Sequence, residues 1–427
     1  MVLLEESQGL KQSLCEAKQI SRPNQSYSLL TKNIEMADNL NLAGVLGVLL
    51  VLTIFHNPII VYAGEGVPNV ALFTFGDSYY DAGNKVFLSQ RKDLPQTYWP
   101  YGKSRDYPNG KFSDGHIVPD FIADFISIPN GVLPPVLKPG VDISRGVSFA
   151  VADASILGAP VESMTLNQQV VKFKNMKSNW NDSYIEKSLF MIYIGTEDYL
   201  NFTKANPNAD ASAQQAFVTN VINRLKNDIK LLYSLGASKF VVQLLAPLGC
   251  LPIVRQEYKT GNECYELLND LAKQHNGKIG PMLNEFAKIS TSPYGFQFTV
   301  FDFYNAVLRR IATGRSLNYR FFVTNTSCCG VGTHNAYGCG KGNVHSKLCE
   351  YQRSYFFFDG RHNTEKAQEE LAHLLYGADP DVVQPMTVRE LIVYPTGETM
   401  REYWEPNNLA IRRRPSRDFY LGLSAYY

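Results

Sequence analysis

The sequence predicts one large α/β domain, in which a mostly parallel sheet carries helices on both faces. Short apolar runs alternate with longer amphipathic segments, and the short runs are rich in β-branched and aromatic residues. Runs short enough to be buried strands lie at residues 70–75, 189–194, 240–245 and 296–301. In such sheets, functional groups gather at the carboxyl ends of the strands.

Two of the longer segments have the spacing of helices. Residues 216–235 place apolar side chains three and four positions apart, and Gly236 follows as a stop. Near the end of the domain, Thr364 is a suitable N-cap for a helix that runs to Leu375 and closes at Gly377. This alternation of strands and helices predicts a single domain over residues 64–395.

The composition excludes little beyond nucleic-acid binding. Hydrophobic residues make up 45% of the 427-residue chain and aromatic residues 12%, which is enough for a large core. With 41 basic and 40 acidic residues the chain is almost neutral, so no charge excess indicates a nucleic-acid partner. No motif predicts a bound cofactor, and none is expected.

The first 63 residues differ in character from the rest. Residues 1–39 are polar, residues 40–55 are almost wholly apolar, and small residues follow at 63–64. This order predicts a secretory signal peptide that is cleaved after Ala63, and a start at Met36 would give it ordinary length. An uncleaved signal anchor is the less favoured interpretation, because Asn57 and Pro58 interrupt the apolar run.

The cysteines favour an oxidising compartment. Cys15 lies in the segment that would be removed, and an even set remains: Cys250, Cys264, Cys328, Cys329, Cys339 and Cys349. The sequence does not fix their pairing, although the first two would close a short loop. A zinc site that includes His334 and His345 is the less favoured alternative.

Three sequons fit the same compartment, and they predict N-glycosylation at Asn181, Asn201 and Asn325. The last segment, residues 396–427, is irregular, with a basic run at 412–417 among aromatic residues. Such a tail could dock on a partner or on an anionic membrane surface. A solvated chain end is the favoured interpretation.

Two distant motifs predict a nucleophilic site. The tripeptide Gly-Asp-Ser at 76–78 leaves the first strand, which exposes Ser78 at the active edge and at the start of a helix. Asp359 and His362 are three residues apart, so one turn can bring the carboxylate against the imidazole. Asp359 would then orient His362, whose other ring nitrogen would face Ser78.

These motifs resemble the plant GDSL lipase/esterase family of SGNH hydrolases over roughly residues 70–377. The matching segments are 75–84, 146–150, 195–199, 246–252, 328–330 and 359–362. Residues 149–155 and 194–200 resemble the myrosinase-associated and epithiospecifier-modifier branch, particularly its inactive modified-vacuole-phenotype type. The resemblance implies a flavodoxin-like three-layer α/β/α fold, with Ser78, Asp359 and His362 in the triad positions.

The chain departs from the family pattern where the oxyanion would be bound. The family's glycine-rich turn reads Val-Ala-Asp-Ala-Ser at 151–155, and Asp153 would bring a negative charge. Glu197 replaces the asparagine whose amide donates to the oxyanion. Ionised glutamate only accepts hydrogen bonds, and losing one oxyanion donor costs about 10²–10³ in turnover. Alternatively, Glu197 points away and Thr196 or a backbone group substitutes.

Three hypotheses follow. The favoured one is an inactive or impaired glycoprotein of the secretory pathway that works by protein binding. The second is an active carboxylic-ester hydrolase with the Ser-Asp-His triad, and the third is a storage or scaffold protein. For the first, the resemblance implies association with β-glucosidase (myrosinase-type) enzymes, lectins and related GDSL-like proteins, and a role in organising the endoplasmic reticulum and vacuole. Secretion from the cell and an ester or lipid ligand are further expectations.

Overall fold

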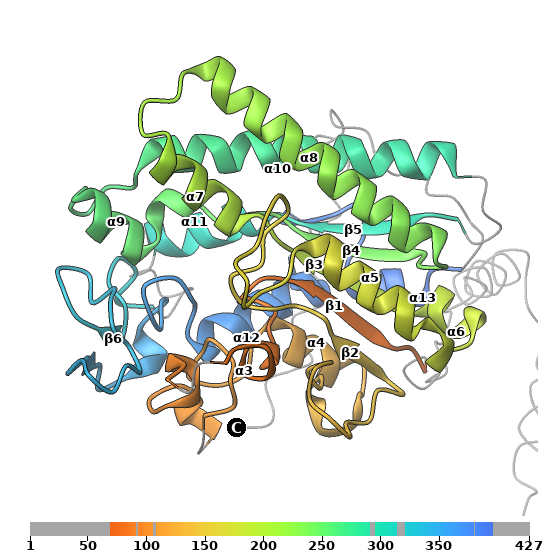
Figure 1. Ribbon diagram of the computed structural model, residues 1–427, viewed down its shortest axis with the longest axis horizontal. Helices are drawn as coiled ribbons and strands as arrows, with labels where there is room; N and C mark the ends of the chain where they lie inside the picture. Colours follow the sequence, from red (N-terminus) through yellow and green to blue (C-terminus); the bar gives the residue numbers. More distant parts are fainter. Residues whose placement is uncertain are drawn as a thin grey trace, which may run out of the picture. The chain divides into compact units, whose positions relative to one another are not determined.

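The central sheet of the computed structural model has six strands in the order β2-β1-β3-β4-β5-β8 (Figure 1). The first five are mutually parallel, and β8 pairs antiparallel with β5 at one edge. The strands are β1 (Leu72–Gly76), β2 (Gly146–Ser148), β3 (Leu189–Tyr193), β4 (Lys239–Gln243), β5 (Gln297–Phe301) and β8 (Val383–Gln384). The order 2-1-3-4-5 is that of flavodoxin-like sheets, which confirms the predicted fold class.

The structure describes residues 69–90, 93–105, 108–290, 295–313, 321–379 and 381–395, which all lie in one compact unit. The predicted signal peptide, the alternative start at Met36 and the tail after residue 395 lie outside these residues. Within the described ranges, no helix is long and apolar enough to cross a membrane.

The four predicted strands are confirmed with small shifts at their ends. Every residue of β1, β3, β4 and β5 is buried, as expected for strands that are covered on both faces. The fourth strand in the chain, β4, ends two residues before the predicted end at 245. The edge strands β2 and β8 were not predicted, because three and two residues are too few to show a pattern.

Helices cover both faces of the sheet. Figure 1 shows α5, α8 and α10 on one side and α4 and α12 on the other. Their bounds are α4 (Val118–Phe125), α5 (Leu166–Met176), α8 (Ala211–Ser234), α10 (Glu266–Ile289) and α12 (Glu365–His373). The other α-helices of the described residues are α3 (Asn84–Leu88), α6 (Asp182–Lys187), α7 (Thr196–Ala205), α9 (Pro252–Tyr258), α11 (Phe303–Thr313) and α13 (Val388–Val393).

Side-chain caps set the start of both predicted helices. The first, α8, begins five residues before the predicted start at 216, because the Asp210 carboxylate accepts a hydrogen bond from the N–H of Ala213. Thr364 caps α12 as predicted, and its hydroxyl oxygen accepts from the N–H of Ala367. The α-helix ends at His373, and a π-helical turn continues to residue 378.

The carboxyl end of β1 lies very close to β3. Gly76 has a φ of 145°, and a Cβ at this position would lie 2.0 Å from the carbonyl oxygen of Tyr193. The N–H of Asp77 donates to the same oxygen at 3.2 Å. Only glycine fits this approach, so the glycine of the Gly-Asp-Ser motif places the following serine at the junction of the two central strands.

Candidate active site

The structure brings the three predicted triad residues together at the carboxyl edge of the sheet. Ser78 Oγ is 2.7 Å from His362 Nε2. The other ring nitrogen, Nδ1, is 2.8 Å from each carboxylate oxygen of Asp359. Ser78 is half-buried, whereas His362 and Asp359 are buried. This geometry suits transfer of the serine proton to the imidazole.

Asp359 is held as a carboxylate. Its Oδ1 accepts from the backbone N–H groups of Arg361 and His362, both at 2.8 Å, and its Oδ2 accepts from the Tyr101 hydroxyl at 2.7 Å. Burial acts to raise the pKa of Asp359, but the adjacent His362 and these hydrogen bonds outweigh it and lower the pKa to about 2. The carboxylate therefore stays ionised and fixes the orientation of the imidazole.

Two polar residues of the first motif tie the loop after β1 to the loop after β2. The Asp81 carboxylate accepts from the N–H groups of Gly83, Lys85 and Ala152, at 2.8, 3.1 and 2.8 Å. The amide of Asn84 donates to the carbonyl oxygens of residues 148 and 150, at 2.8 and 2.9 Å. The spacing of this motif therefore positions the nucleophile against the predicted oxyanion turn.

Asp153 keeps the oxyanion turn in a left-handed conformation without glycine. Its φ is 63°, a region that aspartate tolerates better than most residues. Its carboxylate forms an ion pair with Lys85 Nζ at 2.8 Å, so the expected negative charge is partly neutralised. Among the residues described, the backbone N–H groups of Ser78 and Asp153 make no hydrogen bond, so both are free to bind an oxyanion.

Glu197 lies in the first turn of α7 and forms an ion pair with Arg361. Its side chain is 14% exposed and is not among the described residues that line the cavity at Ser78, whereas Arg361 is. The structure thus favours the alternative in which Glu197 points away. The Thr196 hydroxyl is engaged with the Tyr193 hydroxyl at 3.3 Å, so it does not replace the missing amide as a free donor.

The helix that carries Glu197 is anchored on both sides. The Asp198 carboxylate accepts from the N–H groups of Ile156 and Leu157 at 2.8 and 2.9 Å, which joins α7 to the loop after β2. Burial raises the pKa of Asp198 to about 6, although these hydrogen bonds oppose the shift. The Tyr199 hydroxyl lies 2.9 Å from His275 Nδ1, which joins α7 to α10.

A cavity of about 360 Å³ opens beside Ser78. Apolar side chains on its wall include Leu94, Phe112 and Ile253, and the cationic side chains of Lys341 and Arg361 also line it. Its volume is near the lower end of the range for small-molecule pockets. The cavity therefore suits an ester of small or medium size.

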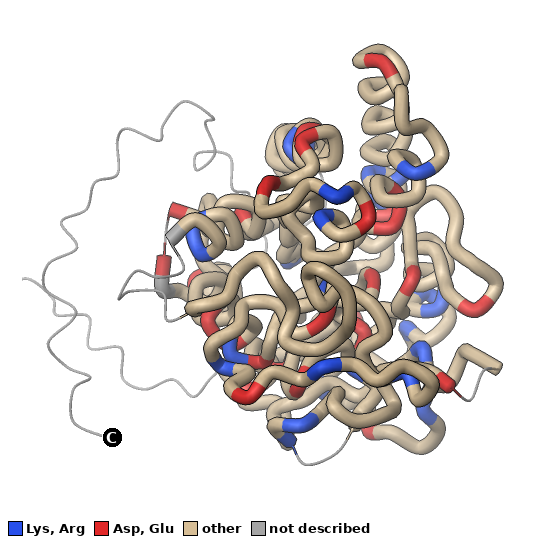
Figure 2. Tube along the Cα trace, turned by 90° about the vertical axis from the view of Figure 1, so that its left-hand side faces the viewer, with Lys and Arg blue, Asp and Glu red and all other residues tan. Residues whose placement is uncertain are grey.

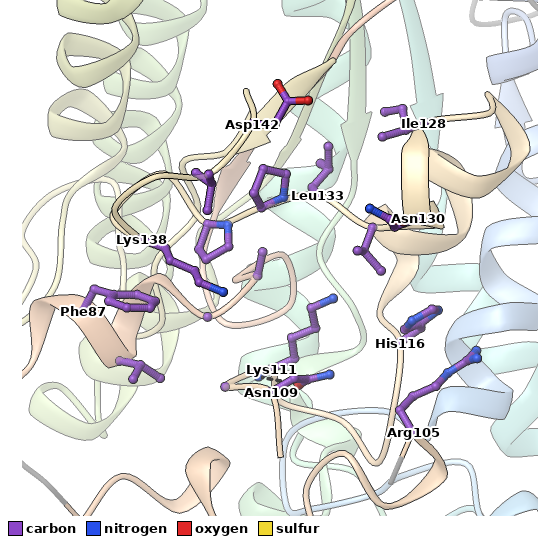
Figure 3. A pocket seen from close by; sticks show the side chains of 18 of the residues that line it. Phe87, Arg105, Asn109, Lys111, His116, Ile128, Asn130, Leu133, Lys138 and Asp142 are labelled. Atoms are coloured by element: carbon purple, nitrogen blue, oxygen red, sulfur yellow. Dashed lines mark hydrogen bonds between the residues drawn. The ribbon is translucent and has the colours of Figure 1, made fainter. Parts of the chain in front are cut away.

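A larger cavity of about 820 Å³ lies among residues 82–146 and contains no triad residue (Figure 3). Two of its cations are neutralised: Lys111 pairs with Asp120 at 2.6 Å, and Arg105 pairs with Glu365 at 2.7 Å. Nucleophilic chemistry therefore belongs to the smaller cavity. On the side of the domain seen in Figure 2, basic and acidic positions are interspersed.

Disulfides use all six of the predicted cysteines. The pairs are Cys250–Cys264, Cys328–Cys349 and Cys329–Cys339. The disulfide interpretation is confirmed, and no thiolate of this set is left for the zinc alternative. His334 Nδ1 instead lies 2.8 Å from the carbonyl oxygen of Asn325, and His345 is exposed.

The cystine-rich segment supports the triad. The N–H groups of Cys328 and Cys329 donate to the carbonyl oxygens of Phe357 and Phe358, at 3.0 and 2.8 Å, directly before Asp359. Cys339 lines the cavity at Ser78. Two disulfides thus fix the chain that leads into the triad carboxylate.

The predicted glycosylation sites differ in their surroundings. Asn181 and Asn201 are exposed, and the Asn181 side chain caps α6. Asn325 is half-buried, and its amide donates to Asn262 at 2.7 Å. Attachment of a glycan is therefore easier at the first two positions.

Sequence reasoning missed three residues of the site: Tyr101, Lys85 and Arg361. No motif marks Tyr101, because its contact with Asp359 spans 258 positions. The position of Arg361, inside the Asp359–His362 turn, was a usable signal. A cation one residue from the triad histidine must lie near the site, whichever way it points.

Comparison with known proteins agrees with the motifs. A sequence model described as GDSL-like lipase/acylhydrolase matches residues 72–375. GDSL esterase/lipase ESM1 of Arabidopsis thaliana is 99% identical over 392 residues, which are 92% of this chain and 100% of that protein. From the same plant, GDSL esterase/lipase 22 is 70% identical over 87% of this chain and 94% of its own length. Inactive GDSL esterase/lipase-like protein 23 is 68% identical over 90% of this chain and 99% of its own length. The match over most of the chain establishes that it belongs to the GDSL lipase/esterase family.

Proposed function

We propose that this protein is an active serine hydrolase of carboxylic esters. The observation that carries the proposal is the assembled Ser78–His362–Asp359 hydrogen-bond chain, next to two backbone N–H groups that have no partner among the residues described. The favoured sequence hypothesis, an inactive or impaired protein, depended on the lost asparagine donor, on the altered turn at 151–155 and on the negative charge of Glu197. The ion pair of Glu197 with Arg361 weakens the part of that hypothesis that depends on the charge of Glu197.

The chemistry follows from the geometry in two steps. Ser78 Oγ attacks the ester carbonyl carbon while its proton passes to His362 Nε2, and the tetrahedral oxyanion accepts hydrogen bonds from the backbone N–H groups of Ser78 and Asp153. The intermediate expels the alcohol, which takes the proton from His362. Water then attacks the acyl-serine carbonyl carbon and gives a proton to His362. The second tetrahedral intermediate expels Ser78 Oγ, which takes that proton back from His362, and the carboxylic acid leaves.

Turnover of p-nitrophenyl acetate and butyrate by the folded protein tests this proposal. Ser78→Ala should lower kcat by about 10⁴-fold or more, since triad members act as one unit. Ser212→Ala, an exposed serine on α8, is the matched control and should leave kcat unchanged. A fluorophosphonate probe should label Ser78, as read by peptide mass spectrometry. Turnover that survives Ser78→Ala would contradict the proposal.

A binding function is the second candidate, because a relative 68% identical to this chain is named inactive. In that case the cavity at Ser78 binds an ester or lipid without cleaving it, and the protein associates with β-glucosidase (myrosinase-type) enzymes, lectins or related GDSL-like proteins. Affinity capture from an endomembrane fraction, with Ser78→Ala as bait, tests it. Reproducible recovery of a glycosidase or lectin supports the binding function, and recovery of chaperones alone counts against it.

We also propose that the protein enters the secretory pathway as a glycoprotein. Three disulfides and two exposed sequon asparagines support this, because both features belong to an oxidising compartment. Residence in the endoplasmic reticulum or vacuole, a part in endomembrane organisation, and release from the cell are the finer expectations. Enzymatic deglycosylation should reduce the mass of the wild type, and by less in Asn181→Gln. Imaging of an internally tagged protein distinguishes the compartments.

A further inference from the structure

The two carboxylates that replace the family's oxyanion residues both face cations. Asp153 pairs with Lys85, and Glu197 pairs with Arg361. The Glu197 side chain is 14% exposed against 50% for Asp153, whereas the Arg361 side chain is 36% exposed against 8% for Lys85. Water therefore screens the Glu197 carboxylate less than it screens that of Asp153, and Arg361 keeps an exposed part that a ligand can reach.

Arg361 is held at its backbone as well as at its side chain. Its N–H donates to Asp359 Oδ1 at 2.8 Å, and its carbonyl oxygen accepts from the Tyr79 hydroxyl. At the preceding residue, a Cβ on Gly360 would lie 2.3 Å from the carbonyl oxygen of Ala336, so this turn fits tightly against the neighbouring chain. The backbone of Arg361 is thus held in a tight turn, and its guanidinium is held by Glu197 on α7.

The environment keeps Arg361 charged. Burial acts to lower its pKa, but the carboxylates of Glu197, Asp153, Asp359 and Glu257 outweigh burial and raise it. Tyr337 also faces this group. If Arg361 is lost, Glu197 loses its ion pair, whereas Asp153 keeps its ion pair with Lys85.

Arg361 lines the cavity at Ser78, and Glu197 does not. Arg361 lines that cavity together with Ser78 and His362, whereas Glu197 is absent from the described residues of its wall. A guanidinium carries five N–H donors, and one carboxylate can occupy only part of them. Donors remain for a ligand in the cavity.

We propose that Arg361 stabilises the oxyanion in place of the family's asparagine amide, and that Glu197 is a positioning residue that holds the guanidinium. The inference rests on the proposed ester hydrolase. On this view, the exchange of asparagine for glutamate removes one hydrogen-bond donor, but Glu197 holds another donor, the Arg361 guanidinium, in position. A fixed cation beside a developing negative charge lowers the energy of the transition state without reorganisation.

Single and double variants test the pair, with kcat and KM measured separately on p-nitrophenyl butyrate. Arg361→Ala should lower kcat by about 10²–10³-fold with little change in KM, because the donor acts only on the oxyanion. Arg361→Lys should recover part of that loss. Glu197→Gln should cost about tenfold, since the guanidinium loses a charge-assisted contact. Arg389→Ala, an exposed arginine on α13, is the matched control and should match the wild type.

The double variant Glu197→Asn/Arg361→Ala gives the sharpest result. It removes the unpaired carboxylate and restores the amide donor, so kcat should rise at least about tenfold above that of Arg361→Ala. It also guards against a folding artefact, because neither partner of the ion pair is left alone. Circular dichroism and melting temperature check the fold of every variant.

The outcomes separate the two proposals. Ser78-dependent turnover that is unchanged in Arg361→Ala, or a double variant no faster than Arg361→Ala, overturns the inference and leaves the ester hydrolase standing. A wild type without Ser78-dependent turnover and without probe labelling at Ser78 overturns the proposed function and the inference with it.

Discussion

The nucleophile side of the site (Ser78, Asp359 and His362) and its oxyanion side (Asp153 and Glu197) are stabilised in different ways. On the nucleophile side, hydrogen bonds of 2.7–2.8 Å join the three side chains directly. On the oxyanion side, each carboxylate is balanced by a cation from another segment, Lys85 or Arg361. The nucleophile side is therefore held by hydrogen bonds among its own residues. The oxyanion side depends on cations from other segments that neutralise its carboxylates.

Carboxyl pKa values show the same contrast. The pKa of Asp359 on the nucleophile side is lowered to about 2, because His362 and several donors outweigh burial. Asp198 and Asp81, which support the oxyanion side, have pKa values raised to about 6, because burial outweighs their backbone hydrogen bonds. As the pH falls below about 6, Asp198 and Asp81 should therefore be protonated first, while the Asp359 carboxylate stays ionised.

The largest expected effect is on the nucleophile side. Asp359→Asn should lower kcat by about 10⁴-fold, because an amide cannot hold the imidazole in the productive tautomer or stabilise its protonated form. The measurement is the rate of p-nitrophenyl butyrate hydrolysis at neutral pH, with Asp270→Asn on α10, an exposed aspartate, as control. A loss smaller than about tenfold, or 1.4 kcal/mol, would show that the observed hydrogen bonds do not serve catalysis.

An intermediate effect is expected in the acid stability of the oxyanion side. The pKa of Asp198 is about 6 in the folded protein and about 3.9 in an unfolded chain, so the folded state binds the extra proton between these values. Falling pH therefore stabilises the wild type relative to Asp198→Asn, by up to about 1.4 kcal/mol per pH unit within this window.

Urea unfolding of both proteins at pH 7, 6, 5 and 4 measures that difference. As the pH falls below 6, the free energy of unfolding of the wild type should increase relative to that of Asp198→Asn. Asp270→Asn again serves as the control for a change of charge on the surface. Parallel curves for the wild type and Asp198→Asn would remove the distinction between the two sides.

The smallest effect is expected at Asp153. In Asp153→Gly, relief of the left-handed backbone gains about 1 kcal/mol, while loss of the half-exposed ion pair with Lys85 costs about 0–1 kcal/mol. The free energy of unfolding should change by less than about 1 kcal/mol, and kcat by only a few-fold. Thermal melts and steady-state kinetics check this. A large gain in kcat would show that Asp153, despite Lys85, impairs the oxyanion site.

Sequence reasoning predicted the frame of the molecule well, because that frame depends on local patterns. Four buried strands followed from short apolar runs, and the Thr364 cap followed from residue type. The short edge strands β2 and β8 were not predicted, because neither is long enough to show a recognisable pattern of apolar residues. For the cysteines, the sequence indicated disulfides, but their pairing needed the folded chain.

By itself, the sequence determined the α/β fold, the family and the three residues that meet at the nucleophile. Each of these follows from residue types at fixed spacing, which local physical chemistry constrains. Only the tertiary structure decided what Asp153 and Glu197 do. The cation that faces Glu197 is 164 positions away, and the direction of a side chain depends on that partner and not on its neighbours in sequence. Electrostatic interactions act through space, so the fold decides which charges neutralise one another at the site.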